Sequence, residues 1–406
     1  MVGRQPILDR RRHVFGYELV FRPSDELDAA EATTDDATAH VIADGMLSFG
    51  LDKLTHGRRA FIELSPSFLR HDVVKVLPTS VVLQVPCDAP LDEATVEACQ
   101  RWKREGYAIA LSRFTPDESS ADLLPIADFV KMDFLTAGSR AAQSHILTHA
   151  GPAASALIAS KVEAVEIFNE AVREGFSHFQ GYFFEKPSTL QTRAIPRGQI
   201  GYLRLLYALN DPNLSVNDLE DLMKHDAALC FRMLRTVNSA AFAQSRDVTS
   251  IRHALMLLGR DTIRRWASLW VMADLGAEAH PELVEMASIR GRFCEIVATK
   301  KAGADAGGEA FLLGMCSCLD VILERPMVSI LEELPLSAQV VSALLGRDNP
   351  ARQLLDCATT YERGDFASCL RVADAAGLQR SWLSPAYADA LNWVHQLRQP
   401  AGKRVS

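Results

Sequence analysis

The feature of this sequence that most limits its fold is a change of pattern near Pro187. Before that point, short apolar runs rich in Val, Ile, Phe and Tyr alternate with helix-like stretches. Seven runs are predicted to be strands: 15–21, 58–64, 80–86, 107–114, 128–134, 155–162 and 176–184. Strand–helix alternation predicts a parallel sheet with right-handed crossovers, and this number of strands favours a closed (β/α) barrel. Seven strands leave open whether that barrel is complete.

Beyond Pro187, the pattern is almost entirely helical. Apolar residues recur with a spacing of about 3.6 in these segments: 199–209, 216–224, 227–238, 251–258, 261–275, 282–302, 310–323 and 384–397. Ser215, Asp226 and Ser250 stand before three of them as N-caps. The segment 187–196, which has two prolines and no apolar core pattern, predicts the domain boundary. We therefore expect an α/β domain over residues 1–190 and an all-α domain over 197–400.

Composition excludes several classes of protein. The 406 residues carry a net charge of -8, whereas general nucleic-acid binders usually carry a basic excess. No uninterrupted apolar run reaches about 18 residues, so we expect no membrane span. Charges interrupt the N-terminus where a signal peptide needs an apolar run. The eight cysteines form no C-x-x-C pair, which argues against zinc and favours reduced thiols in a cytoplasmic protein.

Three motifs in the first half carry a resemblance to a known family. They are Glu18-Leu19-Val20-Phe21-Arg22 for the pattern E-x-L-x-R, Asp128, Lys131 and Asp133 for D-x-x-K-x-D, and Gln180-Gly181-Tyr182 for Q-G-Y. Residues 1–190 thereby resemble the EAL domain, which hydrolyses the bacterial second messenger cyclic di-GMP. The resemblance implies a barrel of TIM type and metal-assisted attack of water on a phosphodiester.

Several positions depart from that family's metal ligands. Carried over position by position, the chain retains Glu18, Lys131 and Glu163. Glu63 stands where the family has an Asn, and Gln84 and Ser160 each stand where it has a Glu. Ser112 and Arg113 stand where the family has two adjacent Asp residues. Divalent cations need several hard oxygen ligands, and Arg113 introduces a permanent positive charge instead. We therefore predict that the chain is not an enzyme and has no catalytic residues, no metal and no cofactor.

Two alternatives remain open for the cations of this site. Arg22 and Arg113 could bind a phosphate group through their forked donors. Arg113 could instead form an internal salt bridge with Glu63, Glu18 or Asp133, because buried charges are normally paired. Lys131 is likewise either the partner of a carboxylate inside the barrel or a catalytic group.

The second half resembles the HDOD domain, a family related to HD phosphohydrolases and viewed as a non-catalytic output module. The resemblance rests on Asn210-Asp211-Pro212, Val237-Asn238-Ser239, Ser250-Ile251-Arg252-His253-Ala254 and Leu258-Gly259, in this order. His225-Asp226 is an HD dipeptide, but we interpret Asp226 as an N-cap. At the position of the hydrolase dyad the chain has Leu319-Asp320.

Two weaker patterns complete the survey. His145 and His149 have a spacing of four residues, but no metal-protease glutamate lies between them, which favours a solvated surface pair. The basic stretch with Arg252, Arg260, Arg264 and Arg265 is either a solvated helix face with local counter-charges or a surface for an acidic partner or a phosphate.

These observations lead to three hypotheses. The first is a cytoplasmic bacterial signalling scaffold that binds unidentified partner proteins, in cyclic di-GMP-linked control of motility or biofilm formation, a pathway implied by the resemblance alone. The second is a receptor that binds cyclic di-GMP without cleaving it. The third is residual phosphodiesterase activity through Glu18 and Glu63.

Overall fold

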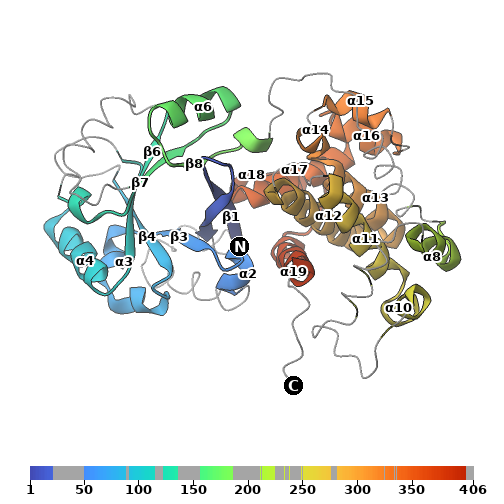
Figure 1. Ribbon diagram of the computed structural model, residues 1–406, viewed down its shortest axis with the longest axis horizontal. Coiled ribbons are helices and arrows are strands. Elements are labelled where there is room, and N and C mark those ends of the chain that lie inside the picture. Colours follow the sequence, from blue (N-terminus) through green and yellow to red (C-terminus); the bar gives the residue numbers. More distant parts are fainter. Residues whose placement is uncertain are drawn as a thin grey trace. The chain divides into compact units, whose positions relative to one another are not determined.

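The structure is a computed structural model that divides into two units (Figure 1). It describes residues 1–21, 50–87, 91–114, 122–135, 156–185, 211, 213–224, 233, 237, 248, 250–275, 281–323, 325–332, 334 and 336–398. The first unit, the barrel unit, comprises Met1–Lys186 and Thr360–Phe366. The second, the helical unit, comprises Pro187–Thr359 and Ala367–Ser406. The sequence patterns gave no sign that a short segment near residue 360 would group with the first unit.

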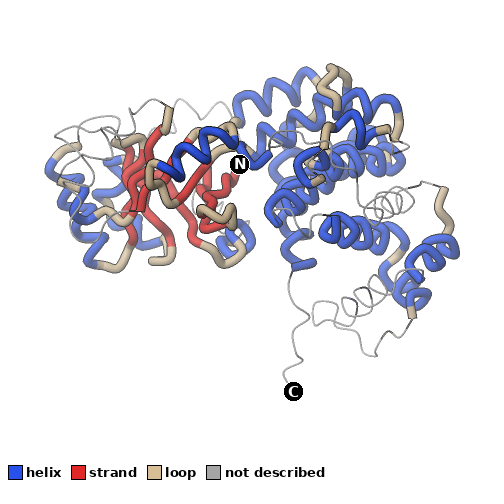
Figure 2. Tube along the Cα trace, turned by 45° about the horizontal axis from the view of Figure 1, so that its top comes forward, coloured by secondary structure: helices blue, strands red, loops and turns tan. Residues whose placement is uncertain are grey.

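Eight strands close into a barrel in chain order (Figure 2). They are β1 (Val2–Asp9), β2 (Val14–Phe21), β3 (Arg59–Glu63), β4 (Val81–Pro86), β5 (Ala108–Ser112), β6 (Phe129–Asp133), β7 (Ala156–Ser160) and β8 (His178–Gln180). Closure leaves no strand with an unpaired edge. The barrel is therefore complete, which the seven predicted strands had left open.

The prediction of an all-parallel sheet is wrong at β1, which the sequence patterns missed. This strand runs antiparallel to both β2 and β8, while the remaining neighbours are parallel. The connection from β1 to β2 is a short turn in which the Asp9 carboxylate accepts hydrogen bonds from the backbone of Arg11 and His13, both at 2.8 Å. A turn this short cannot cross over the sheet, so β1 must reverse its direction. Polar residues and Pro6 hide the strand pattern.

Helices of the barrel unit lie on the connections between strands. They are α2 (Leu51–Thr55), α3 (Pro66–Arg70), α4 (Glu93–Arg104) and α6 (Val165–Arg173), with single-turn helices η2 (Asp72–Val76), η4 (Leu124–Ile126) and η5 (Phe183–Glu185). The longest, α4, begins where the Asp92 side chain accepts a hydrogen bond from the Thr95 amide. Its buried face carries Trp102, whose indole N–H donates to the Leu69 carbonyl at 2.6 Å. This bond fixes α4 against α3, the helix that contains Leu69.

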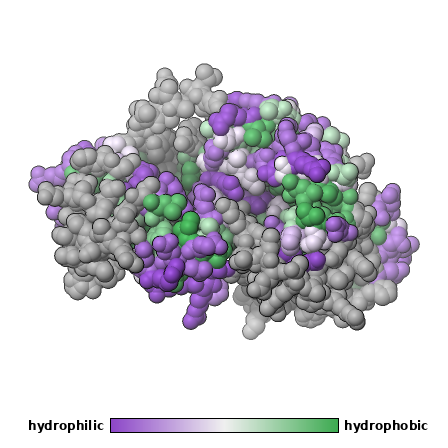
Figure 3. Space-filling model, turned by 90° about the horizontal axis from the view of Figure 1, so that it is seen from above, coloured by the Kyte–Doolittle hydropathy of each residue, from purple (hydrophilic) through white to green (hydrophobic). Residues whose placement is uncertain are grey.

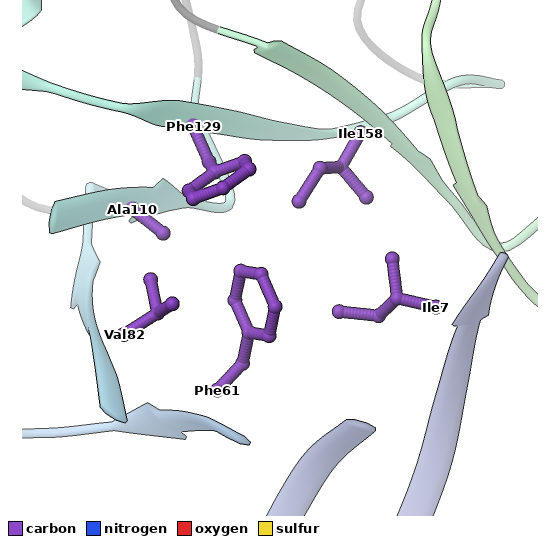
Figure 4. Packing of buried hydrophobic residues seen from close by; sticks show 6 residues of the cluster. All are labelled: Ile7, Phe61, Val82, Ala110, Phe129 and Ile158. Atoms are coloured by element: carbon purple, nitrogen blue, oxygen red, sulfur yellow. The ribbon is translucent and has the colours of Figure 1, made fainter. Parts of the chain in front are cut away.

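One layer of apolar side chains fills the barrel interior (Figure 4). It consists of Ile7, Phe61, Val82, Ala110, Phe129 and Ile158, each from a different strand and each buried. Successive side chains of a strand point to opposite faces, so these six show which residues of their own strands face inward.

The helical unit contains α8 (Val216–Lys224), α10 (Ile251–Leu258), α11 (Arg260–Leu275), α12 (Pro281–Ala302), α13 (Ala304–Cys316), α14 (Leu319–Ile322), α15 (Met327–Leu331), α16 (Ala338–Leu344), α17 (Pro350–Glu362), α18 (Phe366–Ala375) and α19 (Arg380–Arg398). The predicted caps Ser215 and Ser250 are confirmed, since each hydroxyl accepts a backbone hydrogen bond at 3.1 Å. The third predicted cap, Asp226, and the predicted helix 199–209 lie outside the described residues, as does nearly all of 227–238.

The single helix predicted over 310–323 is wrong. Helix α13 ends at Cys316 and α14 starts at Leu319, because the backbone N–H and the hydroxyl of Ser317 both donate to the Gly314 carbonyl. Within the described part of the chain, no helix is long and apolar enough to cross a membrane.

Helices α12 and α13 pack in close contact. A Cβ atom on Gly314 would lie 2.3 Å from the backbone nitrogen of Gly291, closer than real Cβ atoms come. Nearly every residue of α12 from Glu282 to Glu295 is buried, so this helix lies at the centre of the unit.

Candidate functional site

A polar layer lies directly above the apolar layer of the barrel. Two residues after the core side chains of β3, β4, β5, β6 and β7 stand Glu63, Gln84, Ser112, Lys131 and Ser160. Because side chains alternate along a strand, these polar groups face the same interior as the core. They lie toward the carboxyl ends of the parallel strands, where TIM-type barrels carry their sites. The sheet thus brings together residues that are distant in the sequence.

Glu18 on β2 is the centre of this layer. Its Oε1 atom accepts hydrogen bonds from Lys131 Nζ at 2.6 Å and from Gln84 Nε2 at 2.7 Å. Its Oε2 atom accepts one from Gln180 Nε2 at 2.5 Å, and this amide also donates to Gln5 Oε1 at 2.9 Å. The side chains of Glu18 and Lys131 are only 13% and 11% exposed. The carboxylate is therefore fully engaged by groups of the chain itself.

The electrostatics of Glu18 follow from these contacts. Burial by itself raises the pKa of the carboxyl group, because it disfavours the charged form. The charge of Lys131 and the hydrogen bonds from Lys131, Gln180 and Gln84 outweigh burial and lower the pKa below its ordinary value. Glu18 is therefore a carboxylate at neutral pH, and it is neutralised by a lysine.

A second ion pair lies at the rim of the barrel. Arg113 Nη1 is 2.8 Å from Glu63 Oε1, and the Ser112 hydroxyl donates to Glu63 Oε2 at 2.8 Å. Half of the Arg113 side chain is exposed. Its φ of 51° places the residue in the left-handed region directly after β5. Of the interpretations that the sequence left open for Arg113, the structure contains the salt bridge with Glu63.

A third pair involves a residue that the sequence patterns did not single out. Lys161, which follows β7 with a φ of 58°, contacts Asp133 Oδ2 through its Nζ atom at 2.7 Å. Neighbouring Ser160 donates its hydroxyl to the Met132 carbonyl at 2.8 Å. The polar Gln5 was also missed. Its position two residues before core residue Ile7, on a strand that runs in the opposite direction, is the signal that could have revealed it.

The remaining predicted residues lie elsewhere. Glu163 is exposed on the connection between β7 and α6. Arg22, His145 and His149 lie outside the described residues. Asp128 stands before β6, where it binds Lys103 Nζ at 2.6 Å and the Ile109 amide at 2.8 Å. Within the motif D-x-x-K-x-D, Asp128 therefore makes a structural contact outside the polar layer, whereas Lys131 belongs to that layer.

The glycine of the Q-G-Y motif, Gly181, has a structural role. A Cβ atom at this position would lie 2.0 Å from the Val162 carbonyl oxygen. No larger residue fits without a backbone shift, so the glycine permits the close approach of two chain segments beside Gln180.

The donor set does not fit the pair of divalent cations that the EAL resemblance implies. Three carboxylates of the site already have a cation of the chain beside them in the described structure: Glu18 has Lys131, Glu63 has Arg113 and Asp133 has Lys161. Hard dications require several free oxygen ligands. Among the residues that the structure describes, no group of three or more His, Cys, Asp or Glu side chains is arranged to hold a metal ion.

The helical unit also uses its predicted basic residues internally. Arg252 pairs with Glu220 at 2.8 Å and donates to Asn217, and Arg265 pairs with Glu295 at 2.9 Å. The side chains of Arg260 and Arg264, and the whole of the His225-Asp226 dipeptide, lie outside the described residues. Leu319, at the position of the hydrolase dyad, is buried in α14.

Comparison with known proteins places the chain in a family. The HDOD domain model matches residues 196–333. The chain is 30% identical over 405 residues to the uncharacterized protein YuxH of Bacillus subtilis, with 98% of each chain covered. It is 31% identical over 368 residues to the cyclic di-GMP phosphodiesterase CdgJ of Vibrio cholerae, with 90% of this chain and 85% of CdgJ covered. The chain belongs to the family of these EAL–HDOD proteins.

Two solved structures with EAL domains are similar to part of the chain. The EAL domain of Xanthomonas citri FimX, solved in complex with c-diGMP, is 16% identical, with 45% of this chain and 86% of that chain covered and a TM-score of 0.37. The Bacillus subtilis YkuI protein, solved with c-di-GMP and calcium, is 18% identical, with 55% of this chain and 70% of that chain covered and a TM-score of 0.37.

Proposed function

We propose that this chain is a signalling protein linked to cyclic di-GMP that acts by binding partner proteins and does not hydrolyse the nucleotide. The observation that carries the proposal lies at two positions where the family pattern has acids: Gln84 donates its amide to Glu18 Oε1 at 2.7 Å, and Arg113 pairs with Glu63 at 2.8 Å. A neutral amide and a cation thus stand where that pattern supplies metal-binding carboxylates.

The energetics support this proposal. Two unit charges 4 Å apart interact by about 4 kcal/mol at an effective dielectric constant of about 20, so a dication at that distance from an ammonium group is repelled by about 8 kcal/mol. Because Lys131 belongs to the family pattern, carboxylates have to offset this repulsion, and Gln84, Ser112 and Ser160 replace three of them. Glu63 is a poorer alternative ligand, because Arg113 and Ser112 already bind both of its oxygens.

Hydrolysis itself tests the proposal. The wild-type chain, with magnesium or manganese, is expected to leave cyclic di-GMP intact when the products are separated by chromatography, while CdgJ in the same assay serves as the active control. A variant with Gln84→Glu, Ser112→Asp, Arg113→Asp and Ser160→Glu restores the carboxylates of the family pattern. We expect this variant to bind manganese more tightly than the wild type by calorimetry. Turnover by the wild type that disappears in Glu18→Ala would overturn the proposal.

A phosphodiesterase is the second candidate, and one observation favours it. CdgJ, at 31% identity over most of both chains, bears the name of that activity. In this case Glu18 and Glu63 would have to supply the ligands, and the product assay with Glu18→Ala distinguishes the two candidates.

A receptor without turnover is the third candidate, favoured by the half-exposed guanidinium of Arg113 at the barrel rim. Calorimetry with cyclic di-GMP decides it. We expect no heat of binding at high micromolar nucleotide, whereas binding that weakens in Arg113→Ala would assign the rim to the nucleotide and make the chain a receptor.

A further inference from the structure

A cluster of arginines lies at the end of the barrel opposite the polar layer. The turn that joins β1 to β2 contains Arg10, Arg11 and Arg12, and Arg58 and Arg59 lie where β3 begins. The polar layer lies toward the carboxyl ends of the parallel strands, whereas β3 starts and β1 ends on the other side. TIM-type barrels use that side for stability and not for chemistry. We call these five arginines the basic end.

Contacts at the start of β2 hold two of these arginines beside the turn. Arg58 donates a hydrogen bond from its guanidinium group to the carbonyl of Val14, the first residue of β2. Arg59 pairs with Gly16 in the register of β2 and β3, and its Cζ atom lies 5.6 Å from the centroid of the Phe15 ring. The turn and the start of β3 therefore form one surface, although they are far apart in the sequence.

Arg10 extends this surface toward β8. Its Nε atom donates to the Phe176 carbonyl at 2.9 Å, just before β8. Burial lowers the pKa of His178, the first residue of β8, and the charge of Asp9 opposes this shift. The charges of Arg10 and Arg59 each lower this pKa further. Both guanidinium groups are therefore close enough to the same imidazole to act on it.

Asp9, the acid of the turn, does not neutralise the basic end. Its carboxylate accepts hydrogen bonds from the backbone of Arg11 and His13, and its Oδ2 atom lies 3.7 Å from His13 Nδ1. The neighbouring Arg173 and Glu174 add one charge of each sign. Within the described structure, four guanidinium groups have no carboxylate as an ion-pair partner: Arg10, Arg11, Arg58 and Arg59. The basic end thus carries a net positive charge on a chain whose net charge is -8.

The exposure of the basic end indicates how it would bind a partner. Arg10, Arg11, Arg58 and Arg59 are all exposed, and no exposed large apolar side chain that the structure describes belongs to the cluster. By contrast, apolar side chains gather in patches between hydrophilic ones on the face of the molecule seen in Figure 3. The basic end offers forked donors, which match carboxylates bidentately. Its occupant is therefore selected by charge and not by apolar burial.

The size of the cluster distinguishes between anionic occupants. A nucleic acid carries one charge about every 3.4 Å along each strand, so a bound strand would continue past the cluster. The chain as a whole has 51 acidic and 43 basic residues, and its surface therefore repels a long polyanion beyond the cluster. A few carboxylates of a protein segment match the cluster without this extension. These considerations favour a short acidic segment over a nucleic acid or a broad anionic membrane.

We propose that the basic end binds a short acidic segment of a partner protein, whose carboxylates pair with Arg11, Arg58 and Arg59. This inference rests on the proposed function, because it names the chemistry of the partner that a protein acting by contact would bind. The cluster lies at the opposite end of the barrel from the polar layer, so this partner would bind without touching Glu18.

The test uses the full chain and a fluorescein-labelled peptide of about eight glutamates, whose dissociation constant is measured by fluorescence anisotropy at about 0.05 M salt. The double variant Arg11→Glu with Arg58→Glu reverses two charges of the basic end. Arg104→Glu with Arg347→Glu changes two exposed arginines outside it and is the matched control, because the net charge changes equally. Thermal melting verifies that both variants fold like the wild type.

The double variant should bind the glutamate peptide about tenfold more weakly than the wild type, and the control variant within about twofold of it. Arg11→Gln should weaken binding about threefold. The Arg11 side chain makes no hydrogen bond or ion pair with a described residue, so this single variant keeps the test valid if the double variant melts early. A peptide of the same length made of glutamines should not bind, and about 0.5 M salt should weaken the glutamate peptide about tenfold.

Several outcomes would overturn the inference. These are equal binding of the glutamate and glutamine peptides, or equal weakening by the double variant and its control. A single-stranded oligonucleotide or phosphatidylserine vesicles that bind more tightly than the peptide, and lose binding in the double variant, would assign the basic end to phosphate groups instead. Tighter peptide binding after the acids of residues 25–36 are replaced by amides would assign it to the chain's own acidic segment.

Failure of this inference and failure of the proposed function are distinguishable. Hydrolysis of cyclic di-GMP by the wild type would end the proposed function without changing the peptide affinities. Loss of the peptide result would leave the absence of hydrolysis as it is.

Discussion

The barrel unit and the helical unit each contain a glutamate that is largely shielded from solvent, but they compensate its charge in different ways. Glu18 in the barrel is paired with one lysine and receives hydrogen bonds from two neutral amides. Glu295 in α12 is 7% exposed and lies between two arginines, with Arg265 and Arg292 each at 2.9 Å from one of its oxygens. The first carboxylate thus depends on a single cation, and the second is shared by two.

This difference indicates how strongly the stability of each unit depends on its carboxylate. Arg292 also pairs with Asp389, so its guanidinium group retains a partner if Glu295 is lost, and Arg265 is 20% exposed and stays partly solvated. Lys131 is 11% exposed, and Glu18 is its ion-pair partner in the described structure. The polar layer of the barrel should therefore respond to the loss of its carboxylate more strongly than the centre of the helical unit does.

The largest expected effect comes from Glu18→Ala. The substitution leaves the Lys131 ammonium buried without its partner, which should lower the free energy of unfolding by about 3–5 kcal/mol in urea denaturation. Glu163→Ala, an exposed glutamate of the same unit, serves as the control and should stay within about 0.5 kcal/mol of the wild type. The double variant Glu18→Leu with Lys131→Met removes both charges and should recover most of the loss. A double variant no more stable than Glu18→Ala would mean that shape rather than charge is responsible.

Glu295→Ala should lower the free energy of unfolding by an intermediate amount, about 1–3 kcal/mol. The substitution removes one acceptor from each of two arginines, but both arginines stay partly solvated. Urea denaturation of the full chain measures it against Glu332→Ala, an exposed glutamate of the same unit. A loss larger than that of Glu18→Ala would reverse the comparison between the two units.

Acid should act on the barrel through the same carboxylate. The pKa of Glu18 in the folded state is lowered from the ordinary value of 4.5, so the unfolded chain takes up the proton first as the pH falls. The resulting stabilisation is fully present above the unfolded pKa and is lost as the pH falls through the folded pKa. The melting temperature of the wild type should therefore fall more steeply below about pH 4.5 than that of Glu18→Gln. Parallel curves for the two proteins would contradict this origin.

The smallest effect is expected at the rim. Arg113 is half exposed, so its pair with Glu63 is screened by water, and Arg113→Ala should cost less than about 1 kcal/mol in urea denaturation. Arg113→Lys retains the charge without the forked donors and serves as the matched variant. A loss comparable to that of Glu18→Ala would mean that the rim pair, too, holds the barrel together.

Sequence alone located most of the polar layer, since the EAL motifs placed Glu18, Lys131 and Gln180 at one site. Short apolar runs rich in Val, Ile, Phe and Tyr also predicted β2 to β8, although their bounds differ by a few residues. It missed β1, because Arg4, Gln5 and Pro6 break the apolar pattern that identifies a strand, and because the direction of β1 depends on the length of a turn. In the helical unit, the periodicity found α8 and α10 but joined α13 to α14, since a single hydroxyl at Ser317 ends the first.

The sequence by itself determined where most strands and helices form, and it placed Gln84, Ser112, Arg113 and Ser160 at the positions where the family pattern has acids. Which cation stands beside which acid was decided only by tertiary structure. Glu18 and Lys131 are 113 residues apart, and Asp133 meets Lys161 from the neighbouring strand. Such pairs depend on strand register and on the closure of the barrel, which are properties of the whole sheet and not of any one segment.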